Sequence, residues 1–253
     1  MPDKTNLNIE RTRQFLVIAA TAGVIFVNYL AGAGFINNKT PADISDQYPT
    51  LVTPAGYAFS IWGLIYAGLF AFSIYQALPA QIARFSKIRT LYLINCAANC
   101  AWLYLWHYEQ IPLSLLIIFV MLGSLILINV NLPKADSPLE IWLARIPFNI
   151  YFGWLTVATI LNFSTALVFL GFDAGGAAKI FFASALIVAA TILGIVIHFK
   201  LASAAYPLTI AWAITAIAIK HSTETIIVTT AAFGVIFLLI AALSGFAKTK
   251  KLL

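Results

Sequence analysis

Aromatic and amide side chains recur at helical spacing in one stretch of the sequence that otherwise consists mainly of apolar residues. Positions three and four residues apart lie on the same face of an α-helix. Because an amide that faced lipid hydrocarbon would be costly, we expect this face to point into a bundle of helices. The face carries Asn95, Asn99, Trp102 and Trp106.

Two further stretches show the same combination of residue types. Aromatic rings offer stacking area and amides orient the few polar groups of a ligand, so three such faces meeting in one bundle would suit a flat, largely apolar molecule. The alternative is structural, because a buried Asn often only joins two helices, an interaction worth about 1 kcal/mol. A Trp near a helix end often anchors at the membrane interface, which is our interpretation of Trp142 and, as a second candidate, Trp106. The two stretches carry Phe59, Trp62 and Tyr66, and Trp154, Ala158 and Asn162, with Asn149 and Tyr151 nearby.

The composition indicates which elements must position these faces. Of 253 residues, 62% are hydrophobic and 9% are charged, whereas a soluble domain carries roughly 25% charged residues. A helix needs about 20 apolar residues to cross a bilayer, and the sequence contains eight runs of that kind. We therefore predict an all-α membrane protein, an eight-transmembrane-helix bundle. The predicted spans are 14–34, 55–78, 88–107, 111–132, 139–164, 176–199, 203–220 and 224–246, with tails at 1–13 and 247–253.

The Lys and Arg residues test this topology, because cytoplasmic connectors carry an excess of them. With the N-terminus inside, twelve lie on the cytoplasmic side and three lie outside. We therefore expect both termini in the cytoplasm and the chain in the cell membrane, plasma or inner. Ala31-Gly-Ala33 resembles a signal-peptidase site, and cleavage there would leave seven helices. The inner set is Lys4, Arg11, Arg13, Arg84, Lys87, Arg89, Lys134, Arg145, Lys200, Lys248, Lys250 and Lys251, and the outer set is Lys39, Lys179 and Lys220.

Other kinds of chemistry find little support in the sequence. Topology explains the net charge of +6, so we expect no nucleic-acid partner. No phosphate-binding loop, dinucleotide fingerprint or metalloprotease motif is present, and no charged residue falls near a bilayer centre, which argues against an ion-coupled pump. Cys96 and Cys100 are interpreted as small residues at a helix contact rather than a disulfide or a metal site. We predict no catalytic residue, no metal and no covalently bound cofactor; haem ligation is the alternative to an interfacial position for the helix-end histidines His107, His198 and His221.

Three motifs, on the second, third and fifth predicted helices, resemble those of the TspO/MBR family, the tryptophan-rich sensory or translocator proteins. The resemblance covers residues 14–165, a TspO-like five-helix unit, and leaves three additional helices at 176–246. The motifs read Thr53-Pro-Ala-Gly-Tyr-Ala-Phe-Ser-Ile-Trp-Gly-Leu-Ile-Tyr66, Asn99-Cys-Ala-Trp102 and Trp154-Leu-Thr-Val-Ala-Thr-Ile-Leu-Asn162.

The resemblance implies a five-helix bundle in which the loop after the first helix folds over a pocket. Family members bind tetrapyrroles, sterols and related hydrophobic molecules, often as dimers, so it implies a hydrophobic small-molecule ligand such as a porphyrin, and a homodimer. This sequence departs from the family pattern before the second helix, where Ala55 replaces a second proline, and in the fifth, where Pro147 lies further upstream. The implied ligand-binding residues are Trp62, Tyr66, Asn99, Trp102, Trp154, Ala158 and Asn162, with Pro54 in the lid loop.

We therefore expect a non-enzymatic membrane protein that binds a tetrapyrrole or sterol-like molecule and acts as a sensor or transport regulator. The alternatives are a secondary carrier for a neutral or amphiphilic solute, an intramembrane enzyme that modifies a pigment, and a structural scaffold. Internal repeats, or helices broken by Gly or Pro at mid-membrane, would favour a carrier. The sequence shows no convincing repeat and no acid–base pair within the bilayer.

Overall fold

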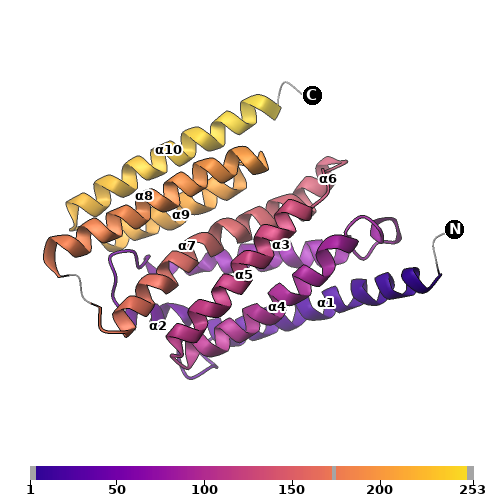
Figure 1. The fold of residues 1–253 in the computed structure, drawn as a ribbon, viewed down its shortest axis with the longest axis horizontal. Coiled ribbons are helices and arrows are strands. Elements are labelled where there is room, and N and C mark those ends of the chain that lie inside the picture. The colour runs from indigo at the N-terminus through magenta and orange to yellow at the C-terminus, as the bar shows by residue number, and fades with distance from the viewer. Residues whose placement is uncertain (1–3, 173–174, 250–253) are drawn as a thin grey trace. The chain divides into compact units, whose positions relative to one another are not determined.

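The computed structural model describes residues 4–172 and 175–249, and this part of the chain is helical and contains no strand. Each of the eight predicted spans is occupied for most of its length by a helix (Figure 1). α1 begins at Lys4, so most of the predicted N-terminal tail is helical, and α10 extends into the predicted C-terminal tail. The α-helices are α1 (Lys4–Gly32), α2 (Pro41–Gln47), α3 (Ile61–Tyr75), α4 (Ser86–His107), α5 (Ile111–Asn131), α6 (Pro138–Glu140), α7 (Ile146–Phe169), α8 (Gly176–Leu201), α9 (Ala205–Lys220) and α10 (Thr225–Thr249); the 3-10 turns η1 (Gly56–Ser60) and η2 (Pro79–Gln81) and the π-helical turn η3 (Ile141–Arg145) complete the order.

Six helical segments of the described chain are long and apolar enough to cross a bilayer. The helical membrane fold is therefore confirmed, whereas the number of eight spans stays a prediction. α9 is apolar but has 16 residues, about 24 Å of helix against a hydrocarbon thickness of about 30 Å. α4 has 22 residues, but its Lys87, Arg89 and two asparagines lower its hydropathy. The six segments are Leu7–Gly32, Gly56–Tyr75, Ile111–Asn131, Pro138–Phe169, Gly176–Leu201 and Thr225–Ser244.

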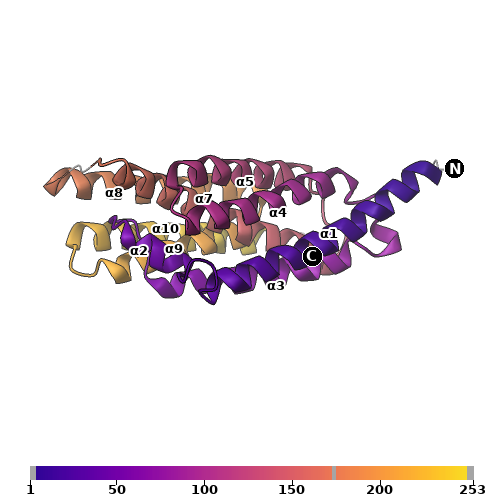
Figure 2. The same cartoon turned by 90° about the horizontal axis from the view of Figure 1, so that it is seen from below.

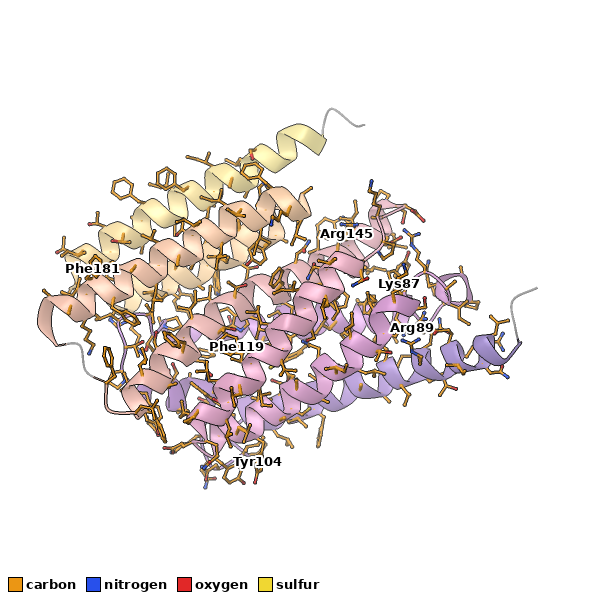
Figure 3. The ribbon with its side chains drawn as sticks, viewed as in Figure 1. Lys87, Arg89, Tyr104, Phe119, Arg145 and Phe181 are labelled. Atoms are coloured by element: carbon orange, nitrogen blue, oxygen red, sulfur yellow. The ribbon has the colours of Figure 1, made fainter. Side chains whose placement is uncertain are left out.

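Large apolar side chains cover the exposed faces of these helices, the reverse of the distribution in a soluble protein. Phe119 on α5 and Phe181 on α8, both labelled in Figure 3, are 51% and 77% exposed. Amides are instead buried, among them Asn95, Asn99 and Asn162. This distribution is expected where lipid rather than water surrounds a protein.

The chain forms two compact units that are each assembled from two stretches of sequence. The first unit comprises Met1–Pro41 and Trp62–Phe148, and the second comprises Ala42–Ile61 and Asn149–Leu253. α7 therefore contributes its first residues to one unit and its remainder to the other.

In the first unit, α4 packs against both α1 and α5 (Figures 1 and 2). Its core is aromatic: the ring of Phe72 on α3 lies 5.5 Å from Phe85, 5.8 Å from Tyr92 and 4.8 Å from Phe148, in each case edge to face. Phe72, Phe85, Tyr92 and Phe148 are all essentially inaccessible. Edge-to-face pairs are a favoured arrangement of aromatic rings, so this cluster joins α3, α4 and the start of α7.

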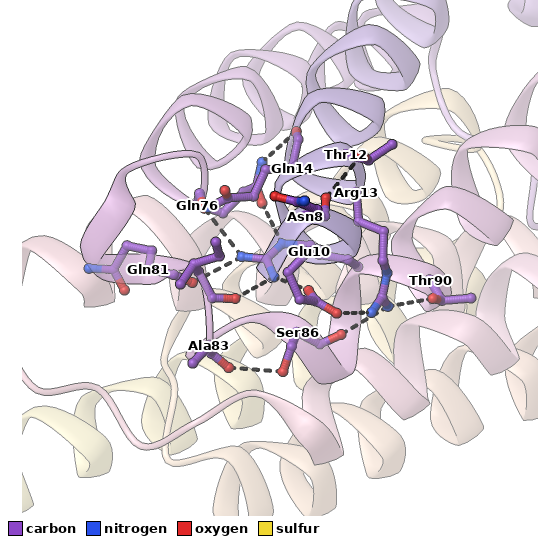
Figure 4. Close-up of polar contacts among 12 residues, drawn as sticks. Asn8, Glu10, Thr12, Arg13, Gln14, Gln76, Gln81, Ala83, Ser86 and Thr90 are labelled. Carbon is purple, nitrogen blue, oxygen red and sulfur yellow. Dashed lines mark hydrogen bonds and ion pairs between the residues drawn. The ribbon is translucent and has the colours of Figure 1, made fainter. Parts of the chain in front are cut away.

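A fully buried arginine ties α1, the end of α3 and the start of α4 together. The guanidinium of Arg89 donates from Nε to Gln76 Oε1 at 2.8 Å, and from Nη1 to Glu10 Oε2 at 2.5 Å and to the Ile82 carbonyl at 2.6 Å. Its Nη2 donates to the Gln81 carbonyl at 2.9 Å. Figure 4 shows Glu10, Gln76 and Gln81 converging from these separate segments. Every nitrogen of the guanidinium thus has an acceptor, which a buried charge requires.

Several cationic side chains of this unit gather at the same end, whereas Lys39 pairs with Glu109 beyond the other end of α4. Arg13 pairs with Glu10 and also donates to the Ser86 carbonyl at 3.0 Å (Figure 4). Lys87 and Arg145 lie at this end as well, and Tyr104 lies at the opposite end (Figure 3). The arrangement agrees with the charge asymmetry read from the sequence, and its assignment to the cytoplasmic side stays a prediction.

In the second unit, α8, α9 and α10 pack against one another (Figure 1). Glycines allow close contacts in this unit: a Cβ added at Gly153 on α7 would lie 2.8 Å from the Tyr206 carbonyl oxygen of α9, and one at Gly194 on α8 would overlap Leu238 of α10. Small residues at helix contacts are typical of membrane bundles, where close packing replaces the hydrophobic effect.

The segment between α2 and α3 is held to α9 within this second unit. The Ala55 amide donates to the Ala216 carbonyl at 3.0 Å, and Trp212 Nε1 donates to the Ala58 carbonyl at 3.2 Å. The rings of Tyr57 and Trp212 also meet edge to face at 5.2 Å. These contacts hold the connector in place, which would otherwise be stabilised only by hydrogen bonds within its own short turns.

We predict that Arg89→Met destabilises the protein by about 1–3 kcal/mol, because it leaves the buried Gln76 side-chain oxygen without its donor and removes one of the two cationic partners of Glu10. The free energy of unfolding in a denaturing detergent titration measures the effect. Lys87→Met is the matched control, since Lys87 is exposed on the same turn of α4. Equal stability of the two variants would contradict the structural role of Arg89.

We also predict that Gly153→Ala lowers stability by about 1–3 kcal/mol, because the added methyl group would meet backbone that cannot move aside easily. Gly23→Ala on α1 is the control: its Cβ would have no neighbour within 4 Å, so alanine's higher helix propensity should leave stability unchanged or raise it. Thermal unfolding of both variants in the same detergent tests the pair, and a neutral Gly153→Ala would speak against the close packing of α7 on α9.

Candidate functional site

Four of the predicted ligand-binding residues meet in the first unit: the aromatic residues Trp62, Tyr66 and Trp102, and the amide Asn99. Trp62 and Tyr66, one turn apart on α3, stack with their centroids 5.4 Å apart and their planes 11° apart. The ring of Trp102 on α4 lies 6.4 Å from that of Trp62, and Trp106 stacks on Trp102 at 5.6 Å. The fourth, Asn99, borders this stack, so α3 and α4 together present one continuous aromatic surface.

The amide of Asn99 links this surface to α1. Its Oδ1 accepts from Asn28 Nδ2 at 2.7 Å, and its Nδ2 donates to the Tyr66 hydroxyl at 3.5 Å. Asn28 Nδ2 also donates to the Val24 carbonyl at 2.9 Å. Asn99 is 1% exposed, so these contacts satisfy groups that neither water nor lipid could reach.

The indole nitrogen of Trp102 stands out among the polar groups of the cluster. The side chain is 5% exposed, and Nε1 is buried without a hydrogen-bond partner among the described residues. Leaving a buried donor unsatisfied costs about 1–3 kcal/mol, so native structures usually satisfy such groups or use them. An acceptor atom on a bound molecule would satisfy this one.

Asn95 shares the helical face of Asn99 but has another role. Its Nδ2 donates to the Met121 carbonyl at 3.1 Å and to Ser124 Oγ at 2.8 Å, both on α5. For this residue the structural interpretation is correct, because the amide joins two helices.

The interpretation of Trp106 as an interface anchor is wrong. Trp106 is 2% exposed, and its Nε1 donates to the Pro41 carbonyl at 3.2 Å, so it is part of the aromatic stack. Trp142, in contrast, is 67% exposed, as an interface anchor should be. A tryptophan close to the end of a helix can therefore lie in either setting, and only its tertiary neighbours distinguish them.

The other four predicted residues belong to the second unit. Trp154 on α7 is 3% exposed and its ring meets that of Phe59 edge to face at 5.9 Å. Ala158 follows one turn later and is half-buried, and Asn162 is buried. Pro54 is buried in the connector held to α9, the place that the resemblance assigns to a lid.

The cluster contains one polar residue that the sequence analysis missed. Asn28 lies near the end of α1 and bonds directly to Asn99. The sequence offered one signal for Asn28, an amide side chain inside an apolar span. In lipid such a group must find a hydrogen-bond partner within the protein.

The histidines use backbone carbonyls as partners. His107 Nδ1 lies 2.8 Å from the Leu103 carbonyl, and His198 Nδ1 lies 2.9 Å from the Ser203 carbonyl. His221, just beyond α9, places Nε2 3.1 Å from the Thr53 carbonyl. Across residues 4–172 and 175–249, no three His, Cys, Asp or Glu side chains gather as a metal site would require, and both cysteines are free thiols.

Apolar spanning helices with a buried aromatic and amide cluster define a multi-pass membrane protein of the TspO kind. The chain belongs to the family of TSPO-like proteins, whose model matches residues 14–244. The match continues through α8, α9 and α10, so the three helices beyond the predicted five-helix unit lie within the matched region. No curated protein and no solved structure matches the chain.

We predict that Asn28 and Asn99 are energetically coupled. A double-mutant cycle with Asn28→Ala, Asn99→Ala and the double variant should give a coupling free energy of about 0.6–1.7 kcal/mol, the range for hydrogen bonds between membrane helices. Stability in a detergent titration is the measurement. Asn99 paired with Asn131→Ala is the control cycle, because Asn131 is exposed at the end of α5 and bonds only to Leu127 of its own helix among the described residues. Additivity in the first cycle would contradict the bond.

Proposed function

We propose that this protein binds a flat, largely apolar molecule of the tetrapyrrole or sterol-like class against the aromatic cluster of the first unit. The observation that carries the proposal is the buried indole N–H of Trp102, which has no partner among the described residues. Trp102 belongs to one of two neighbouring stacked pairs, Trp62 with Tyr66 and Trp102 with Trp106. Trp62, Tyr66 and Trp102 would contribute stacking area, and Trp102 Nε1 would donate to an acceptor on the ligand.

The family supports the same class of function. TSPO-like membership and the apolar helices suggest a membrane protein of the TspO kind, and the resemblance in the sequence implies hydrophobic ligands. We propose a binding role without catalysis, as sensor or transport regulator, in the cell membrane with both termini in the cytoplasm, and as a homodimer. Trp154, Ala158, Asn162 and Pro54 are proposed as further ligand-binding residues.

Titration with protoporphyrin IX tests the proposal through quenching of the intrinsic tryptophan fluorescence. We expect saturable quenching by the protein in nanodiscs. Trp102→Phe should raise the Kd about tenfold, because it removes one hydrogen bond and part of the stacking area. The Kd rather than the amplitude is compared, since each substitution also removes a fluorophore.

Trp142→Phe provides the matched control, because Trp142 is an exposed tryptophan of the same unit. Its Kd should equal that of the unsubstituted protein. Unsaturable quenching, or equal Kd values for the two variants when both melt at the same temperature, would contradict the proposal. Competition by an unlabelled sterol then distinguishes a sterol-like ligand from a tetrapyrrole.

A secondary carrier is the alternative that the same preparation can test. Mass spectrometry of lipophilic molecules that co-purify from the native membrane should identify a tetrapyrrole or sterol-like compound if the protein is a binder. An empty preparation that nevertheless moves solute into proteoliposomes would favour the carrier.

A further inference from the structure

The second unit contains a pocket that none of the predicted ligand-binding residues lines. Its volume is about 260 Å³. Three segments form its walls: residues 49–52 after α2, the end of α7 with the residues that follow it, from Ser164 to Phe172, and the first half of α8 from Lys179 to Leu186. α8, one of the helices beyond the predicted five-helix unit, thus forms an entire wall.

The walls of this pocket are fixed by contacts within the unit. Thr50 and Val52 are buried, and the Thr50 and Thr53 hydroxyls lie 3.0 Å apart. The carbonyl of Thr53 lies 3.1 Å from His221 Nε2, and the Ala55 amide is bonded to α9. A pocket whose walls are already held in place loses little conformational entropy when it is filled.

The lining side chains are apolar except for the hydroxyls of Thr50 and Ser164 and the charged Lys179. Leu167, Val168, Phe182 and Leu186 are among the apolar ones. The hydroxyl of Ser164 donates to the Ile160 carbonyl of its own helix at 3.0 Å. Most of the interior therefore offers dispersion contacts and no strong hydrogen-bonding group, which suits an aliphatic chain.

Lys179 supplies the charge at the half-exposed rim of the pocket. No carboxylate lies within 4.0 Å of its ammonium in the part of the chain that the structure describes, whereas Lys220 at the same end of the unit is paired with Asp46. α8 begins at Gly176, so the positive end of its dipole lies within one turn of Lys179. An anion at the rim would be stabilised by both.

Lys179 also acts electrostatically on His221. Burial lowers the pKa of His221, and the charges of Lys220 and Lys179 lower it further, against opposing contributions from the Thr53 carbonyl and Glu224. Lys179 is therefore close enough to act on a group of the neighbouring connector.

We infer that this pocket binds an anionic amphiphile, with one aliphatic chain between α7 and α8 and a carboxylate or phosphate head group at Lys179. Pockets for drug-sized molecules occupy about 300–1,000 Å³, so this one suits a single chain rather than a tetrapyrrole. A second void of about 10 Å³ shares the lining residues Val52 and Leu186 with it, and all of its lining side chains are apolar.

Binding of radiolabelled dodecanoate to the whole protein in phosphatidylcholine nanodiscs tests the inference. We expect saturable binding of one molecule per chain, weakened about tenfold by Lys179→Gln, the value of one charge-assisted hydrogen bond. Lys200→Gln, an exposed lysine at the other end of the same helix, should bind dodecanoate like the unsubstituted protein. Dodecan-1-ol, which has the same chain without the charge, should compete weakly.

Two further arms locate the chain and identify the source of the ligand. Val168→Phe, which fills the space between α7 and α8, should abolish binding without changing the protoporphyrin affinity of the Trp102 cluster. Competition by phosphatidylglycerol placed in the nanodisc would show a bilayer lipid as the source, and its absence would show a free carboxylate; both results agree with the anionic amphiphile. Three results would overturn the inference: dodecanoate binding that does not saturate in nanodiscs free of phosphatidylglycerol, an unchanged dodecanoate affinity of Lys179→Gln, or competition by dodecan-1-ol as strong as that by dodecanoate.

Discussion

The constraint on which this structure depends is that polar groups surrounded by lipid must find their partners inside the protein. Arg89 shows its strongest form, because a buried guanidinium draws Glu10, Gln76 and two carbonyls from three separate segments around it. The bond between Asn28 and Asn99 shows the same constraint with neutral groups. Each polar group in an apolar span thereby specifies which helices must be neighbours. The apolar residues cannot specify this, because they are equally stable against lipid and against another helix.

The features that could be predicted from the sequence are those that lipid imposes directly. Each apolar run became a helix, since a span must satisfy its own backbone, and the aromatic and amide periodicity correctly placed Trp62, Tyr66, Asn99 and Trp102 together. Such regularities are local: they need only the rise and turn of one helix. Whether the protein has eight membrane spans depends on whether α4 and α9 cross the bilayer. Hydropathy alone decides this poorly, because α4 is polar and α9 is short.

The features that could not be predicted depend on which helix lies opposite. Asn95 and Asn99 share one face, yet the first bonds to α5 and the second to α1. Trp106 has the position of an interface anchor and is buried in the stack. The early start of α1 has the same origin, because Glu10 looks like part of a charged tail until Arg89 is placed beside it.

The polarity of α4 has a consequence for how the chain enters the membrane. Taken alone, a helix that carries Arg89 and two asparagines would partition poorly from the translocon into lipid. α5 is strongly apolar, follows after residues 108–110, and receives the Asn95 amide. The backbone turns sharply at Glu109, which has a φ of 56°, and the Gln110 amide bonds back to the Leu105 carbonyl at 2.8 Å. α4 and α5 therefore form a hairpin, and insertion of the two helices together would let the hydrophobicity of α5 offset the polarity of α4.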